Sequence, residues 1–433
     1  MPKRNNLVRR NIALSVIFKG MSVALSLLLL PLTVNYLSQV EYGIWVTLLG
    51  VLSWVNYLDM GVGPGLRNKL TEAISLDDVQ AFKSYLSSGI VMIAGLCFIA
   101  VVVLYGVLQV VDLNRILNTT EVTNELLYYA TLYTGIIVLF LFFLSIMDQV
   151  YNAFQQTAVP GFVGVVQSTL MVGFIYFLTR FNYRNMLYFI LAFGISAILS
   201  KLGMCVWFFS RHTGLLPGFK YVNREYMVSL VSLSAKFLLL NVTCIFIYSS
   251  ADFMITLRLG PDLVRDFDIV FKVFYFISTL YFFMFNPLWS AYTDAYVKKD
   301  FIWIRKTLRK TTLLIIPVIL AVIVVALNIR LITRIWTGIE LDIPDSLPLA
   351  IGLYTVGLYW LANWNYFING SGQVNLEIIV SVIAAVGTAV LSWTLMPLLG
   401  TTGMALAMAI VVFLFGTAMC IQTMRILREN CYK

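Results

Sequence analysis

Long apolar runs separated by short polar segments dominate this chain. Each run is close to the roughly 20 residues that a helix needs to cross a membrane. The connections between the runs are too short to hold a folded water-soluble domain. We therefore predict an all-α integral membrane protein with about twelve transmembrane helices. The expected spans are 11–37, 43–63, 85–111, 126–152, 158–179, 185–210, 227–257, 266–290, 311–335, 347–369, 374–397 and 402–426.

The composition supports lipid as the main solvent of the chain. Apolar and aromatic residues make up 60% of the 433 positions, charged residues make up 12%, and the mean hydropathy is +0.87. A water-soluble protein of this size could not bury that much apolar surface. The five cysteines have no metal-ligand spacing, and the single histidine is His212. We predict no catalytic residue, no metal and no cofactor. A membrane enzyme of glycan assembly, such as a polymerase or acyltransferase, would need a base, a nucleophile or a large loop. We find none of these in the sequence.

The lysines and arginines predict the orientation. With the N-terminus inside, nineteen basic residues fall in the expected cytoplasmic segments and seven on the other side. The first apolar run is followed by no small-residue cleavage site, so we interpret it as a retained helix rather than a signal peptide. Both termini are expected in the cytoplasm. The net charge of +9 then reflects topology and contact with anionic lipids rather than a nucleic-acid partner.

An internal repeat divides the chain. The segment Gly65–Ala73 can be laid over Pro287–Ala295, with Leu, Thr and Ala matching and Glu opposite Asp. Both segments end the second span of a six-helix half, and both halves start on the same side. We predict a parallel repeat: an N-terminal lobe at 1–211, a linker at 212–226 and a C-terminal lobe at 227–433. The stretches 66–83 and 288–305 are expected to form amphipathic helices at the cytoplasmic surface.

The first copy of this segment is rich in glycine, with Gly61, Gly63 and Gly65 in D-M-G-V-G-P-G. A nucleotide phosphate loop would need a strand before it and a helix after it. A membrane helix precedes these glycines, and the second copy lacks them. We interpret them as a helix exit at the cytoplasmic surface, and a hinge for opening and closing is a further hypothesis.

Charged residues inside the expected spans are functional candidates, because a charge in the bilayer core is costly. Lys19 and Lys236 lie at similar depths in the first helix of each half, and Lys272 lies in the eighth span. One interpretation is a cationic cavity for an anionic substrate, and the other is a set of neutralising ion pairs. Ion pairing is favoured for Lys201. Asp252 and Asp268 are candidates for coupling to an ion, although Asp252 could equally be a helix cap.

One aromatic run carries amides. In Y-W-L-A-N-W-N-Y-F-I-N-G, Asn365 and Asn369 are one turn apart, as are Trp360 and Trp364. Amides beside indoles are suited to binding sugars, and interhelical hydrogen bonds with an aromatic belt are the alternative. Asn365 and Asn369 are therefore candidate substrate-binding residues.

Three segments carry a resemblance to a known family: E-Y-G-I-W at 41–45, the glycine segment, and N-P-L-W-S-A-Y-T-D-A-Y-V-K-K-D at 286–300. Together they resemble the O-antigen-type flippases. These form the polysaccharide-transporter branch of a superfamily that also contains multidrug exporters and the lipid II flippase. The resemblance runs over the whole chain and agrees with the helix number and the duplication.

The resemblance implies two six-helix lobes around a V-shaped central cavity. It implies translocation of undecaprenyl-diphosphate-linked oligosaccharides from the cytoplasmic to the outer leaflet of the bacterial plasma membrane, by alternating access. Lysines would attract the diphosphate, amides and aromatic rings would suit the sugars, and the tail would stay among the membrane lipids. Coupling to H⁺ or Na⁺ and association with a glycan polymerase are left open. The alternatives are a multidrug or cation exporter of the same superfamily and a non-transporting scaffold of glycan assembly.

Overall fold

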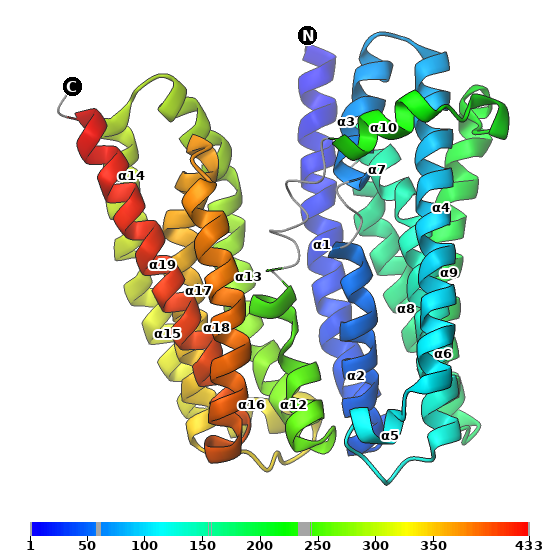
Figure 1. The fold of residues 1–433 in the computed structure, drawn as a ribbon, viewed down its shortest axis with the longest axis vertical. Coiled ribbons are helices and arrows are strands. Elements are labelled where there is room, and N and C mark those ends of the chain that lie inside the picture. Colours follow the sequence, from blue (N-terminus) through cyan, green and yellow to red (C-terminus); the bar gives the residue numbers. More distant parts are fainter. Residues whose placement is uncertain are drawn as a thin grey trace. The chain divides into compact units, whose positions relative to one another are not determined.

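The computed structural model describes residues 2–57, 62–154, 156, 158–232, 243 and 245–431. The chain divides into two compact units, Met1–Asn241 and Val242–Lys433, and each is considered by itself. Both units are built from helices, and no strand occurs among the described residues (Figure 1). The predicted all-α class is confirmed.

The first unit contains the blue to green helices of Figure 1. Its α1 packs on α8, α8 on α9, α9 on α6 and α6 on α4. The short helix α3 lies against α4 and α7. The elements are α1 (Pro2–Tyr36), α2 (Gln39–Ser53), η1 (Trp54–Tyr57), α3 (Val62–Ser75), α4 (Val79–Val110), α5 (Leu113–Ile116), α6 (Asn124–Leu144), α7 (Ile146–Ala153), α8 (Ala158–Arg180), α9 (Met186–Arg211), η2 (Thr213–Leu215), η3 (Phe219–Tyr221) and α10 (Arg224–Ser232).

The second unit repeats this packing order. Its α12 packs on α18, α18 on α19, α19 on α17 and α17 on α15. Because corresponding helices meet in the same order, each unit by itself has the same helix arrangement. The elements are η4 (Ile245–Ser249), α12 (Ala251–Leu259), α13 (Asp262–Val297), α14 (Phe301–Leu313), α15 (Ile315–Leu327), α16 (Ile329–Thr337), α17 (Ser346–Ser371), α18 (Asn375–Leu399) and α19 (Thr401–Cys431).

Seven helical segments of the described chain are long and apolar enough to cross a membrane. They correspond to seven of the expected spans. The helices α13 and α17, with 36 and 26 residues, match two further spans but are less uniformly apolar. The seven segments are Val79–Val110, Asn124–Ala153, Ala158–Arg180, Met186–Arg211, Phe301–Leu327, Asn375–Leu399 and Thr401–Glu429.

The repeat is visible at one turn in each unit. Asp77 and Lys299 both adopt positive φ, at 53° and 58°. The next residue, Asp78 or Asp300, then caps a helix: Asp78 Oδ1 accepts from the backbone N–H of Ala81 at 2.8 Å, and Asp300 Oδ1 from that of Trp303 at 3.0 Å. Asp77, Asp78 and Ala81 correspond to Lys299, Asp300 and Trp303, and each pair is separated by the same number of residues along the chain. The sequence repeat therefore has a matching backbone turn.

These turns correct one expectation. The stretches 66–83 and 288–305 are not single amphipathic helices, because each is divided at the turn. Leu66, Leu70 and Phe82 are buried in the core of the first unit, where α3 packs on α4 and α7. Tyr292 and Ile304 are buried in the same way in the second unit. The apolar face of each stretch therefore packs against its own unit.

The segment between the predicted lobes packs on α4. The backbone N–H groups of Gly218 and Asn223 each donate to a serine on α4, Ser87 and Ser88 respectively, at 3.1 Å. The ammonium groups of Lys83 and Lys220 hold the pKa of the Tyr221 hydroxyl below its usual value. These contacts and α10, which packs on α4 and α3, attach residues 213–232 to the first unit.

Candidate functional site

The second unit brings three of the predicted residues together. On α13, Nζ of Lys272 lies 2.5 Å from Oδ2 of Asp268, one helical turn earlier. The Asp268 side chain is 8% exposed and that of Lys272 is 39% exposed. Asp252, in the first turn of α12, is close enough to interact electrostatically with both. The cluster therefore holds two carboxylates and one ammonium group.

Local backbone geometry explains how Asp252 reaches α13. A π-helical turn, Ile245–Ser249, precedes α12, and such turns are frequent at functional sites. The chain then reverses through Gly260, whose φ of 110° is open to glycine but strained for other residues. This reversal packs α12 on the start of α13. The apolar run predicted at 227–257 gave no sign of the π-helical turn.

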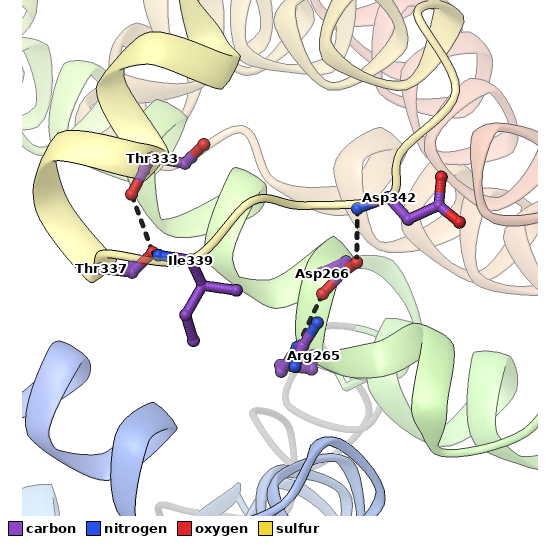
Figure 2. Close-up of polar contacts among 6 residues, drawn as sticks. All are labelled: Arg265, Asp266, Thr333, Thr337, Ile339 and Asp342. Carbon is purple, nitrogen blue, oxygen red and sulfur yellow. Dashed lines mark hydrogen bonds and ion pairs between the residues drawn. The ribbon is translucent and has the colours of Figure 1, made fainter.

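A neighbouring carboxylate, which the sequence reasoning did not single out, has a structural role. Asp266 is 4% exposed. Its Oδ1 accepts from Nε of Arg265 at 2.7 Å, and its Oδ2 accepts from the backbone N–H of Asp342 at 3.2 Å. Figure 2 shows these contacts between α13 and the loop after α16. Asp266 thus ties this loop to α13, while Asp268 belongs to the charged cluster.

The same loop begins with a local cap. The Thr337 hydroxyl donates to the carbonyl of Thr333 at 2.8 Å and accepts from the backbone N–H of Ile339 at 3.3 Å (Figure 2). Gly338, with φ 74°, ends α16 between them. The loop is therefore held at both ends, which fixes the start of α13 that carries the cluster.

An aromatic cavity lies between α13 and α17 in the same unit. Its volume is about 340 Å³, within the range of small-molecule sites. The predicted residue Asn365 lines it, and the buried Oδ1 atom of that amide has no hydrogen-bond partner among the described residues. The other polar lining groups are serine and tyrosine hydroxyls. The aromatic lining residues are Phe271, Tyr275, Phe282, Tyr354 and Tyr366.

The second predicted amide, Asn369, is engaged elsewhere. Its Nδ2 donates to Oε1 of Glu377, at the start of α18, at 3.3 Å. Asn365 is a further amide neighbour of the same carboxylate. Glu377 is 7% exposed and forms no ion pair among the described residues. Asn369 therefore orients a buried carboxylate, and Asn365 connects this carboxylate to the cavity wall.

The two tryptophans of α17 that lie near Asn365 are both used in packing: Trp360 contacts α19, and Trp364 is buried within the second unit. Trp360 Nε1 donates to the Thr417 hydroxyl of α19 at 3.4 Å, and Trp364 is 3% exposed. Their rings meet edge to face at 5.3 Å between centroids. These contacts agree with the packing alternative for the two indoles, and the aromatic rings that line the cavity with Asn365 are phenylalanines and tyrosines of α13 and α17.

In the first unit, the expectation of ion pairing for Lys201 is confirmed. Its Nζ lies 2.6 Å from Oδ2 of Asp148 on α7. Gly63 and Gly65 lie in the first turns of α3, both buried, and a Cβ at Gly65 would meet the carbonyl oxygen of Leu230 at 3.6 Å. This is an ordinary van der Waals distance, so the packing of α10 leaves room for a Cβ at Gly65. Gly61, Lys236 and the side chain of Lys19 lie outside the described residues.

Comparison with known proteins gives a fold and no sequence family. The sequence matches no known family and no curated protein. Solved structures of MATE transporters are similar over nearly the whole chain. An inward-facing multidrug resistance MATE family transporter of the MOP superfamily has a TM-score of 0.74 at 14% identity, covering 94% of this chain and 98% of its own.

Two further structures agree. The Vibrio cholerae MATE transporter VcmN in its bent form gives a TM-score of 0.63 at 14% identity, with 99% of each chain covered. An outward-facing multidrug resistance MATE family transporter gives 0.60 at 14% identity, covering 98% of this chain and 97% of that one. At such identities the likeness concerns the fold alone. The chain is a multi-pass helical protein with the fold of the MATE transporters.

Proposed function

We propose that this chain is a transporter that moves a polyprenyl-diphosphate-linked oligosaccharide across the bacterial plasma membrane by alternating access. The observation that carries the substrate class is the α13–α17 cavity, which is lined by aromatic rings and by Asn365, whose Oδ1 has no hydrogen-bond partner among the described residues. Sugars bind through this combination, because ring faces pack on their C–H surfaces and amides satisfy their hydroxyl groups. The resemblance of three sequence segments to O-antigen-type flippases supports the same class, as does a fold shared with transporters rather than enzymes.

The proposal assigns roles to the predicted residues. Asn365 contacts the glycan, and Asn369 holds the carboxylate that orients Asn365. Lys19, Lys236 and Lys272 attract the diphosphate, and the glycines at 61–65 act as a hinge. The polyprenyl tail stays among the membrane lipids, both termini lie in the cytoplasm, and a glycan polymerase receives the product. Reporter fusions at both termini test the orientation.

The charged cluster favours a second candidate function, export of an organic cation. The cluster holds the carboxylates of Asp252 and Asp268, and acidic side chains within a membrane are suited to binding a cation. Within the flippase proposal, Asp252 and Asp268 bind the coupling H⁺ or Na⁺ instead. The two functions differ in the transported molecule. In the cation exporter the two acids bind the substrate, and in the flippase they bind the coupling ion.

Disruption of the gene separates these functions. A flippase mutant loses the surface polysaccharide and accumulates the lipid-linked repeat unit on the cytoplasmic leaflet. A cation-exporter mutant keeps its polysaccharide and becomes sensitive to cationic dyes. A scaffold mutant loses the polysaccharide as well, but point substitutions such as Asn365→Ala then leave its synthesis intact. Normal lipid-linked intermediates in the disrupted strain would contradict the flippase proposal.

A further inference from the structure

A second, larger cavity lies in the first unit, away from the site described above. It runs between α8 and α9, touches Phe18 of α1, and has a volume of about 820 Å³. Its described lining is apolar except for Gln156, Ser200 and Arg211. None of the predicted substrate or coupling residues lines it, so the transport mechanism leaves this cavity unexplained.

The lining follows one stripe of α9. On α9 the lining positions recur every three or four residues, as 199–200, 203–204, 207 and 211, which places them on one face of the helix. Twelve residues of helix correspond to a length of about 18 Å, roughly half the thickness of a bilayer hydrocarbon core or more. The cavity therefore runs along the helix axis as a groove that is open on one side, where Leu199, Gly203 and Trp207 are exposed. The helix α9 is one of those apolar enough to span a membrane.

The only charged group in this lining is at one end of the stripe. Arg211 lies in the last turn of α9, and its guanidinium carbon is 4.5 Å from the ring centroid of Trp207. Among the described residues, no carboxylate forms an ion pair with Arg211. Tryptophan and arginine at the end of a span mark the level of the lipid headgroups. The cavity thus begins at headgroup level with an available cation and continues into the hydrocarbon layer.

A glycine deepens the middle of the groove. Gly203 lines the cavity, and a Cβ built there would meet no other heavy atom within 4 Å. At other glycines a neighbouring helix occupies this space, as at Gly194, where a Cβ would lie 2.5 Å from Ile137 Cδ1. The room beside Gly203 is left open, so a side chain could be added there without displacing a neighbour.

We propose that this groove binds one anionic phospholipid of the cytoplasmic leaflet. Its phosphate is bound by Arg211, whose planar guanidinium can form two charge-assisted hydrogen bonds to phosphate oxygens. One acyl chain lies between α8 and α9, past Gly203 towards Leu199. A soluble anion would use the arginine but not the apolar stripe, whereas this lipid fits both parts. The inference is independent of what the protein transports.

The test is native mass spectrometry of the full-length protein in detergent with added phosphatidylglycerol or phosphatidylcholine. The wild-type protein should retain one phosphatidylglycerol molecule at collision energies that remove the others, and should retain phosphatidylcholine less. Gly203→Phe fills the groove and Arg211→Gln removes the phosphate ligand. Each should reduce the retained fraction at least about tenfold, a change of ~1.4 kcal/mol in binding free energy.

Matched controls are available in the same two helices. Gly173 on α8 is equally open but lies outside this cavity, and Arg180 ends α8 as Arg211 ends α9. Gly173→Phe and Arg180→Gln should retain phosphatidylglycerol as the wild type does, with unchanged circular dichroism. Wild-type retention by Gly203→Phe or Arg211→Gln would overturn the proposal, as would displacement of the phospholipid by a polyprenyl diphosphate. Gly203→Leu serves if the phenylalanine variant does not fold.

Discussion

Lys272 and Asp268 form an ion pair within one helix, with 2.5 Å between Nζ and Oδ2. An acid placed four residues before a base is the favourable order on a helix. The pair neutralises one charge in a part of α13 where the carboxylate is nearly buried. Asp252, from the neighbouring helix, adds a second carboxylate that interacts electrostatically with the pair. Any role of Lys272 in binding an anion therefore competes with Asp268.

Removal of the lysine should expose this competition. Lys272→Ala removes this ion pair from Asp268, which also interacts with the carboxylate of Asp252, so we expect a loss of stability of about 1–2 kcal/mol. This is less than for a fully buried pair, because the lysine is partly exposed. The double variant Lys272→Ala with Asp268→Asn should regain most of it. Thermal unfolding of the purified protein measures both, and equal melting temperatures for all three proteins would contradict the pairing.

The two acids should differ from the structural acid nearby. Asp252→Asn and Asp268→Asn should each weaken ion-driven transport about tenfold, equivalent to ~1.4 kcal/mol, because a neutral amide does not exchange a proton or hold a cation equally well. Asp266→Asn is the control. It should lower the thermal stability, since the α16–α17 loop loses a contact, and leave the ion dependence of transport unchanged. Ion-gradient-driven uptake into proteoliposomes gives the comparison. Loss of ion dependence in Asp266→Asn alone would contradict these roles.

Asn365 should matter more for transport than for folding. Asn365→Ala removes one amide neighbour of the buried Glu377 carboxylate, so it should lower the melting temperature only slightly and reduce glycan transport. Asn363, two residues earlier, is fully buried and donates to the Thr312 hydroxyl at 2.9 Å. Asn363→Ala should therefore cost about 1–3 kcal/mol of stability. The reverse result, an unstable Asn365→Ala and a stable Asn363→Ala, would contradict the assignment of Asn365 to substrate binding.

The repeated turn predicts a graded effect of glycine. A left-handed residue costs lysine more than aspartate, whose short side chain tolerates this conformation. Lys299→Gly should stabilise the protein by about 0.5–1 kcal/mol and Asp77→Gly by less. Leu76→Gly, at a residue without positive φ, is the control and should stabilise nothing. Asp78→Ala and Asp300→Ala should each cost about 1 kcal/mol as lost helix caps. Unequal losses at these two aspartates would show that the two turns are not energetically equivalent.

Sequence reasoning recovered the elements where the pattern is long and uniform. The helices α8, α9 and α17 begin and end within a residue or two of the expected spans, because apolar runs of this length have few alternatives in lipid. The breaks at Ser145, Leu314 and Asn328 were not expected, since short-range backbone adjustments leave no periodic signal.

The site was recovered in part for a similar reason. Lys272 and Asp268 are four residues apart, so their pairing could have been read from the sequence. The approach of Asp252 depends on the π-helical turn and the reversal at Gly260, which are tertiary features. Tertiary packing also decides which aromatic rings line the cavity with Asn365, and these are phenylalanines and tyrosines rather than the two tryptophans. Which face of α17 meets α13 rather than α19 is decided by packing, and a single amphipathic pattern cannot show it when both faces are apolar.

Transport of the lipid-linked glycan in a reconstituted system tests the central claim most directly. Proteoliposomes containing the purified protein receive a polyprenyl-diphosphate oligosaccharide on one leaflet, and a lectin or glycosidase outside reports its arrival on the other. We expect protein-dependent translocation that Asn365→Ala slows, while a fluorescent organic cation is not transported. Translocation of the cation together with a glycan that stays on its original leaflet would contradict the flippase proposal and favour the cation exporter.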